Sequence, residues 1–249
     1  MKTHFVQTQN YARLLAGMTV LEQRGSRESG GMVITGRPGD GKTTNLKNLG
    51  SRLGAVFVTC TQGMSPGRLV EALADRLGLP ATRYIDEAIG ERLTLDQTPV
   101  LLDEAQFALA DGAACLERLR SITDKSGTPF VLVFMERDLW RVGQREQISS
   151  RIACRVEFRP AELDDITEVC RQLSDVAIAP DLVKRIHTDT QGRMRSVLNA
   201  ISRIEIAART LGKTAVAAAD LRQVVLCDDY RAGLAGLERG GRTTTGRAA

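Results

Sequence analysis

The sequence has few aromatic residues and no long apolar run. Aromatic side chains make up 4% of the 249 residues, whereas apolar types together make up 43%. This leucine- and alanine-rich balance favours an α/β or α protein over an all-β one. No apolar run approaches the roughly 18 residues of a membrane helix, and Lys2 has no apolar segment behind it that would make a signal peptide. We therefore expect a soluble, cytoplasmic protein with no membrane partner.

The sequence also lacks paired cysteines. Its five cysteines are scattered, without a CxxC pair or a nearby histidine cluster, at Cys60, Cys115, Cys154, Cys170 and Cys227. This pattern argues for reduced thiols and against a zinc site. Lysine and arginine number 34 against 30 aspartates and glutamates, a formal net charge of +4. So mild a basicity is compatible with a nucleic-acid partner but does not establish one.

Short apolar runs alternate with helical patterns over the first 160 residues, which is typical of parallel βαβ units. The runs are mostly continuous rather than alternating, as expected when helices cover both faces of a sheet. We predict strands over residues 31–35, 55–60, 99–103, 130–135 and 154–158. A helix is predicted ahead of them, over residues 7–23.

The pattern changes after Pro160, where every segment reads as helix and none as strand. In "GRMRSVLNAISRIEIAART", apolar residues recur at helical spacing, so one face packs inward. The predicted organisation is an N-terminal helix and loop (1–30), an α/β core (31–159), a small all-helical domain (160–228) and a flexible basic tail (229–249).

The stretch "VITGRPGDGKTTN" carries the strongest motif. Gly36, Gly41, Lys42 and Thr43 fit G-x-x-x-x-G-K-[ST] between a predicted strand and a predicted helix. Such a loop curls its backbone amides around phosphate, its lysine bridges the β- and γ-phosphates, and its threonine holds Mg²⁺. We predict ATP and Mg²⁺ as cofactors. The remaining predicted contacts of the loop are Arg37, Pro38, Gly39, Asp40 and Thr44.

A second element, "PVLLDEAQ", ends a buried strand with two carboxylates. Asp103 is placed to order the Mg²⁺ shell, and Glu104 to polarise an attacking water. Asp103 could instead cap the helix that follows. A kinase does not need a water-activating base here, and no N-K-x-D guanine signature follows the loop. Hydrolysis of ATP is the favoured reaction, with Glu104 and Lys42 as catalytic residues.

Together with "FVLVFMERDL", "SSRIACRVEFRP" and "QGRMRSVLNAI", these elements resemble the AAA+ superfamily. Within it the chain resembles the small DNA-transposition ATPases typified by the B protein of phage Mu, over about residues 5–228. The resemblance implies a five-stranded parallel sheet in the order 5-1-4-3-2, with the helical domain packed on it as a lid. It also implies ATP-dependent self-association into an oligomer or helical filament, in a bacterial host cell.

Further site residues follow from the resemblance alone. Glu136 falls at the polar sensor position after the fourth strand, an unusual residue there. Arg151, or else Arg155, matches an arginine that reaches the γ-phosphate of a neighbouring subunit, and a purely structural arginine is the alternative. Arg195 matches a lid arginine that closes over the nucleotide, although it could be an exposed helix residue.

The resemblance also implies duplex DNA, bound without sequence preference, and a transposase as partners. The expected DNA contacts lie between the second and third strands, at Arg68 and Arg83, although a solvated charged face is an equal alternative. Other basic groups with open roles are Arg118, Arg120 and Lys125, and in the tail Arg239, Arg242 and Arg247. A helicase loader or initiator acting on single-stranded DNA, and a regulatory switch that contacts only proteins, are the competing functions.

Overall fold

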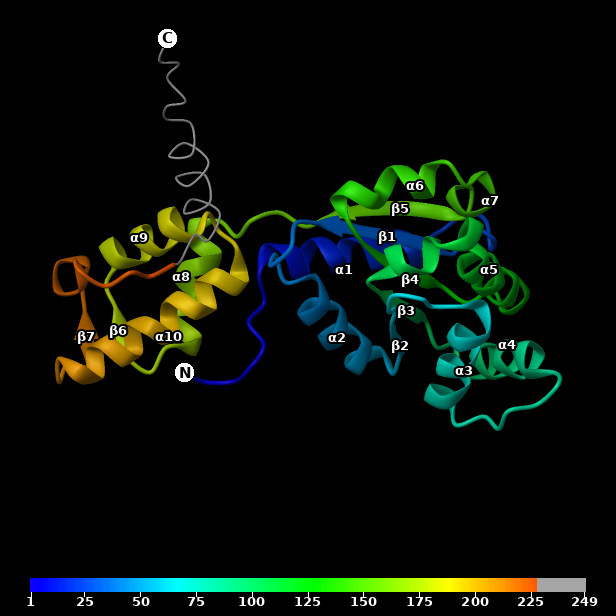
Figure 1. Cartoon of the computed structure of the whole chain (residues 1–249), viewed down its shortest axis with the longest axis horizontal. Coiled ribbons are helices and arrows are strands. Elements are labelled where there is room, and N and C mark those ends of the chain that lie inside the picture. The colour runs from blue at the N-terminus through cyan, green and yellow to red at the C-terminus, as the bar shows by residue number, and fades with distance from the viewer. Residues whose placement is uncertain (228–249) are drawn as a thin grey trace, which may run out of the picture.

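Five parallel strands form one sheet in the computed structural model, which describes residues 1–227 (Figure 1). Their order across the sheet is β2-β3-β4-β1-β5, so the predicted order is confirmed. The strands are β1 Gly31–Gly36, β2 Val56–Thr59, β3 Val100–Asp103, β4 Phe130–Met135 and β5 Ile152–Glu157. All five lie within two residues of their predicted bounds.

Helices cover both faces of this sheet, because each strand offers apolar side chains to both sides. On β1, Met32 and Ile34 pack against α1 and α2, whereas Val33 packs into the cluster on the opposite face. The first face carries α1 Gln9–Glu22 and α2 Lys42–Leu53. The opposite face carries α3 Pro66–Leu77, α4 Ile85–Asp96, α5 Ala114–Ser126, α6 Leu139–Gly143 and α7 Glu146–Ser149. Short 3-10 turns, η1 Ala105–Leu109, η2 Asp111–Ala113 and η3 Glu136–Asp138, connect several of these elements.

The parallel register gathers the strand ends that matter for function. Gly36, the last residue of β1, pairs with Met135 at the end of β4. Asp103, the last residue of β3, pairs with Thr59 of β2. Because carboxyl ends of parallel strands meet at one edge of a sheet, the loops that follow β1, β3 and β4 lie side by side there.

A smaller domain, the lid, follows β5 and has a hydrophobic core of its own (Figure 1, left). Its helices are α8 Leu163–Leu173, α9 Pro180–Thr190 and α10 Met194–Thr210. The N-terminal segment reaches across to it: Val6 is buried in the lid core, and the Lys2 N–H donates to the Leu173 carbonyl at 2.8 Å. The first residues of the chain therefore belong structurally to the lid, although α1 packs on the sheet.

The prediction of an all-helical lid was wrong in one respect. Two short parallel strands, β6 Ala177–Ile178 and β7 Ala215–Val216, pair within it, and β7 leads into the 3-10 turn η4 Ala218–Leu221. The alanine-rich stretch after residue 213 does not form the predicted helix, because its backbone carbonyls accept hydrogen bonds from β6 and from the residue after β6. The Thr214 and Val216 oxygens accept from the Ala177 and Ala179 N–H groups, both at 2.9 Å.

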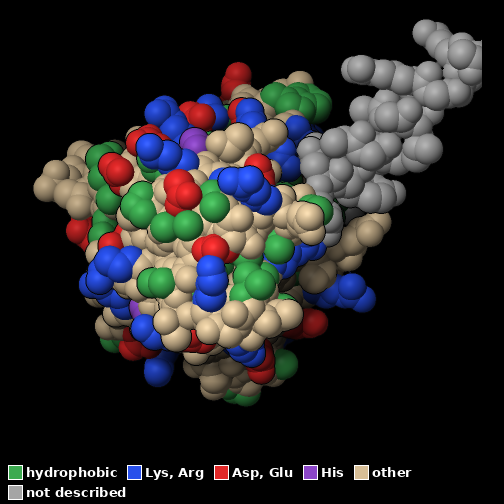
Figure 2. All heavy atoms as spheres, turned by 90° about the vertical axis from the view of Figure 1, so that its left-hand side faces the viewer, with side chains coloured by type: hydrophobic (Ala, Val, Ile, Leu, Met, Phe, Trp, Pro, Cys, Tyr) green, Lys and Arg blue, Asp and Glu red, His purple; other side chains and the backbone are tan. Residues whose placement is uncertain are grey.

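On the face of the lid drawn in Figure 2, basic and acidic side chains are interspersed, without a large patch of either charge. Within residues 1–227, no helix combines the length and the apolarity needed to cross a membrane. The predicted basic tail, with Arg239, Arg242 and Arg247, lies outside the described residues.

Gly192 of the lid packs closely against Ala161, in the segment that follows β5. The need for glycine there can be tested by adding one methyl group. Its φ is +68°, and a Cβ would meet the Ala161 carbonyl oxygen at 2.4 Å. Gly212 is a matched control, since its φ is +65° with nothing within 4 Å of an added Cβ. Both alanine variants pay about 1 kcal/mol for the left-handed backbone, and we expect Gly192→Ala to lose markedly more. Thermal unfolding checks this, and equal midpoints for the two variants would contradict it.

Candidate nucleotide-binding site

The loop between β1 and α2 forms the centre of the site. Gly39 and Gly41 have φ of +94° and +87°, a region that only glycine adopts readily, and these angles turn the backbone sharply ahead of α2. The buried Asp40 carboxylate accepts the Arg37 N–H at 2.9 Å within the loop. Burial raises the pKa of Asp40, opposed by that backbone hydrogen bond and by the Lys42 cation. The sequence thus builds a preformed concave loop at a helix N-terminus, the geometry that binds phosphate.

Lys42, the first residue of α2, is 8% exposed and its ammonium lies inside the loop. Its Nζ donates to the carbonyls of Gly36 and Arg37 at 2.8 and 2.9 Å. Burial lowers the pKa of Lys42, and the carboxylates of Asp40, Glu104 and Asp103 act against that shift, in that order of size. The acidic pair at the end of β3 therefore lies close enough to Lys42 to act on its charge.

The carboxylates that follow β3 are held in distinct ways. Asp103 is 2% exposed, and its Oδ1 accepts the Glu104 N–H at 3.0 Å. Glu104 itself adopts φ +53°, a left-handed conformation that is uncommon for a side-chain-bearing residue and gathers at functional sites. The Gln106 side chain donates to the Glu104 carboxylate. Gln106 stands two residues after the predicted base, but nothing in the motif signals that it orients Glu104.

The site presents the oxygen ligands that Mg²⁺ prefers. Thr43 is half-buried in the first turn of α2, and Asp103 offers a buried carboxylate from the neighbouring loop. Magnesium commonly uses one or two such protein oxygens, with phosphate and water supplying the rest. These residues fit the predicted ion. Asp103 also accepts the backbone N–H of Glu104, the residue that precedes η1, so its alternative role as a helix cap stays open.

The end of β4 presents two residues to this edge. Glu136, predicted as the sensor, is exposed and opens η3. The contact with the loop lysine is made by its neighbour instead, since Met135 Sδ lies 3.9 Å from Lys42 Nζ. The structure therefore places Glu136 beside the site without a described contact to it, and its sensor role stays a prediction.

The lid meets the loop at the start of α10. The Arg195 N–H donates to the Gly39 carbonyl at 3.1 Å. The Arg195 cation also contributes to lowering the pKa of Lys42. Arg195 thus lies directly against the phosphate loop through its backbone, and the action of its side chain on the nucleotide stays a prediction.

Asn10 of α1 links the loop to the segment that joins core and lid, and sequence reasoning missed it. Its side-chain amide donates to the Arg159 carbonyl at 2.7 Å and accepts the Arg159 N–H at 3.0 Å. The same amide nitrogen lies 3.4 Å from the Asp40 carbonyl. A single asparagine ahead of the first strand carries no recognisable motif, so only the folded chain shows this clamp.

A cavity of about 110 Å³ continues from the loop between core and lid. Three parts of the chain supply its walls: the N-terminal segment, the phosphate loop with α2, and the lid helices α8 and α10. Its apolar lining includes Phe5, Val6, Val169, Met194 and Leu198, and its polar lining includes Thr44 and Asn45. Asp40 and Gly41 of the phosphate loop line the same cavity. This cavity could not be predicted from the sequence, because its walls are far apart in the chain.

Arg151 and Arg155 lie on or beside β5, at different heights. Arg151 precedes the strand, and its carbonyl accepts the N–H of Gly31, the first residue of β1, at 2.8 Å. It therefore lies at the amino-terminal ends of the strands, whereas the phosphate loop follows the carboxyl end of β1. Arg155 lies within β5 and donates from Nε to the Thr35 hydroxyl at 3.2 Å.

The arginines between β2 and β3 differ in their surroundings. Arg68, in the first turn of α3, and Arg83, before α4 and 5.9 Å from the Tyr84 ring, are both exposed. Two other arginines are paired: Arg92 of α4 with Asp96 at 2.7 Å, and Arg118 of α5 with Asp86 at 2.9 Å.

Residues 25–142, a little short of half the chain, match the protein-family model described as an AAA domain. This match implies a P-loop nucleotide site, typically with Mg²⁺. The whole fold can be compared with solved structures. Cdc6p from Pyrobaculum aerophilum is 19% identical with a TM-score of 0.66, covering 89% of this chain and 68% of that one. The fold is of the AAA+ type.

Two further AAA+-type neighbours come from Aeropyrum pernix. Its ORC2 protein, solved as ADPNP–ADP complexes, is 17% identical with a TM-score of 0.64, covering 88% of this chain and 67% of that one. Its ORC1 protein, solved in complex with DNA, is 18% identical with a TM-score of 0.58, covering 93% and 65%. No curated protein sequence matches the chain significantly. At these identities the likeness establishes the fold alone, and the particular resemblance to the phage Mu protein is not shown.

Proposed function

We propose that the protein is an Mg²⁺-dependent ATPase that assembles on DNA, with each ATP site completed by a neighbouring subunit. The observation that carries the ATPase part is the sheet order, which brings Lys42, after β1, and Asp103 and Glu104, at the end of β3, to one edge of the sheet. The AAA domain match over residues 25–142 supports it.

Each residue has a physical task in hydrolysis. The Lys42 ammonium leaves the Gly36 and Arg37 carbonyls for the β- and γ-phosphate oxygens, which are stronger acceptors because they are charged. Thr43 and Asp103 would hold Mg²⁺, which would supply charge neutralisation on those phosphates. Glu104, oriented by Gln106, takes the proton from the attacking water. The adenine ring of ATP would lie in the cavity between the N-terminal segment and the lid.

Arg151 acts on the nucleotide of another subunit in this proposal. A six-residue strand is about 17 Å long, and Arg151 lies at its far end from the phosphate loop. An arginine side chain cannot span that distance within one chain. A guanidinium supplied by a neighbour would stabilise the charge that develops on the transferred phosphoryl group.

For the assembly, we propose duplex DNA as the scaffold and a transposase as the client. Arg68 and Arg83 are exposed on the same segment of the core, where they would contact phosphates without reading sequence. The likeness in fold to the A. pernix ORC1 protein, which was solved in complex with DNA, supports the choice of DNA as partner.

An initiator or helicase loader on single-stranded DNA is the second candidate. The observation that favours it is the likeness of the fold to Cdc6p and to ORC proteins over most of the chain. A switch that acts through protein contacts alone predicts no response to DNA of either kind. The three functions therefore differ in one measurable respect, the preferred nucleic acid.

Replacing the proposed base separates binding from chemistry. We expect Glu104→Gln to retain ATP binding and to slow hydrolysis by about a hundredfold or more, since general-base catalysis contributes about 10²–10⁴-fold. Glu91→Gln, on the exposed surface of α4, is the matched control and should hydrolyse normally. Phosphate release and displacement of a fluorescent nucleotide measure the two steps. Hydrolysis near the wild-type rate in Glu104→Gln would assign the base elsewhere.

Replacing the exposed arginines tests the DNA surface. We expect the double variant Arg68→Ala/Arg83→Ala to reduce ATP-dependent co-sedimentation with duplex DNA and to flatten its salt dependence, because two phosphate contacts are lost. Arg92→Ala removes an arginine of the same region that is already paired with Asp96, and should change binding little. Equal loss in both variants would exclude this surface. Tighter binding of single-stranded than of duplex DNA would favour the initiator-like function.

A further inference from the structure

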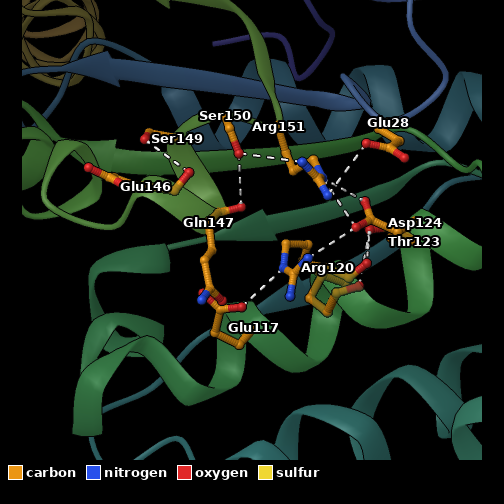
Figure 3. Close-up of polar contacts among 11 residues, drawn as sticks. Glu28, Glu117, Arg120, Thr123, Asp124, Glu146, Gln147, Ser149, Ser150 and Arg151 are labelled. Atoms are coloured by element: carbon orange, nitrogen blue, oxygen red, sulfur yellow. Dashed lines mark hydrogen bonds and ion pairs between the residues drawn. The ribbon is translucent and has the colours of Figure 1, made fainter.

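Arg151 lies in a group of charged side chains from three separate parts of the chain (Figure 3). We call it the Arg151 cluster, and its charged members are Glu28, Glu117, Arg120, Asp124 and Arg151. Glu28 comes from the loop before β1, the next three from α5, and Arg151 from the turn before β5. The hydrolysis scheme above gives no task to any member other than Arg151.

Asp124 is the centre of this cluster. Both of its oxygens accept from Arg151 Nε at 3.2 Å, and Oδ2 also accepts from Arg120 Nη1 at 3.2 Å. Arg120 is held in turn by Glu117 at 3.0 Å. A carboxylate in the last turn of a helix is unfavourable beside the negative end of the helix dipole. Two arginines compensate Asp124, which makes its position well determined.

The other two nitrogens of Arg151 are held more weakly. Nη1 lies 3.4 Å from the Ser150 hydroxyl, and Nη2 lies 3.5 Å from a Glu28 oxygen. The side chains of Arg151 and Asp124 are each 22% exposed, whereas that of Glu28 is 67% exposed. The guanidinium is thus fixed through Nε, which is bound to Asp124. Its two terminal nitrogens, Nη1 and Nη2, make only long contacts.

We propose that Asp124 is a positioning residue for Arg151, and that Glu28 is an internal anion that competes with the γ-phosphate of the neighbouring subunit. This inference rests on the proposed action of Arg151 on a neighbour's nucleotide. Holding Nε orients the Nη1–Nη2 fork, which has only the long contacts to Ser150 and Glu28, to meet phosphate oxygens in a bidentate manner. The long contact to Glu28 is the one that must break first.

The two carboxylates therefore have opposite effects on hydrolysis. Asp124→Asn removes the charge that orients the guanidinium, and we expect kcat of the assembled protein to fall by about ten- to a hundredfold, as misplacement of a catalytic group does. Glu28→Gln removes the competitor and should raise kcat by about twofold, the modest scale of an exposed ion pair. KM for ATP should change little in either variant, because both residues lie far from the phosphate loop of their own chain.

Mixed assemblies locate the effect of Asp124 in one subunit. A chain with Glu104→Gln can donate its arginine but cannot hydrolyse, and a chain with Arg151→Ala can hydrolyse but cannot donate. Mixing the two should restore activity that neither has alone. We expect Asp124→Asn to reduce the restored rate by the same factor, about ten- to a hundredfold, when it is added to the Glu104→Gln chain, and to leave the rate unchanged when it is added to the Arg151→Ala chain.

The outcomes separate this inference from the function on which it rests. If Arg151→Ala hydrolyses ATP normally, or if mixing restores nothing, the action between subunits is wrong and the inference falls with it. If mixing restores activity but Asp124→Asn lowers it equally in either chain, Asp124 is only structural and the inference alone is overturned. A Glu28→Gln variant slower than wild type would overturn the competition. Asp124→Glu, which keeps the charge, should recover part of the loss where Asp124→Asn folds poorly, and thermal unfolding identifies that case.

Discussion

The parallel order of the sheet is the constraint on which the site depends. Placing β4 between β1 and β3 brings the ends of three strands to one edge, each delivering a different chemical group. β1 delivers the phosphate loop, β4 delivers Met135 against the Lys42 ammonium, and β3 delivers the buried Asp103. A lysine and two carboxylates can share so confined a region because their charges offset one another where burial would otherwise disfavour each.

The second requirement is a lid that contacts the phosphate loop through backbone as well as side chain. The hydrogen bond from the Arg195 N–H to the Gly39 carbonyl, and the clamp of Asn10 on Arg159, tie α10, the loop and the interdomain segment together. The N-terminal segment adds a third connection, since Val6 is buried in the lid core. Nucleotide in the cavity would contact all three parts at once, which is how binding could alter the angle between core and lid.

Features written locally in the sequence were predictable, and features assembled from distant segments were not. The strands and the phosphate loop follow from apolar runs and from fixed glycine spacing, and the structure reproduces both. The β6–β7 pair was missed because two-residue strands are too short to show a period, and pairing outweighed the helix propensity of the alanines around residue 217. Asn10, Gln106 and the cavity were missed for another reason: their partners are known only once the chain is folded.

The opposite edge of the sheet holds Arg151 in a polar cluster too far from its own phosphate loop to act there. The proposed function therefore requires contact between subunits, with DNA as the surface that brings them together. The most direct measurement is the rate of ATP hydrolysis per molecule as a function of protein concentration, with and without duplex DNA at low salt. If subunits complete one another's sites, the rate per molecule should rise with protein concentration, and DNA should raise it further at low concentration. A rate per molecule that is constant with concentration and indifferent to DNA would contradict the proposed function.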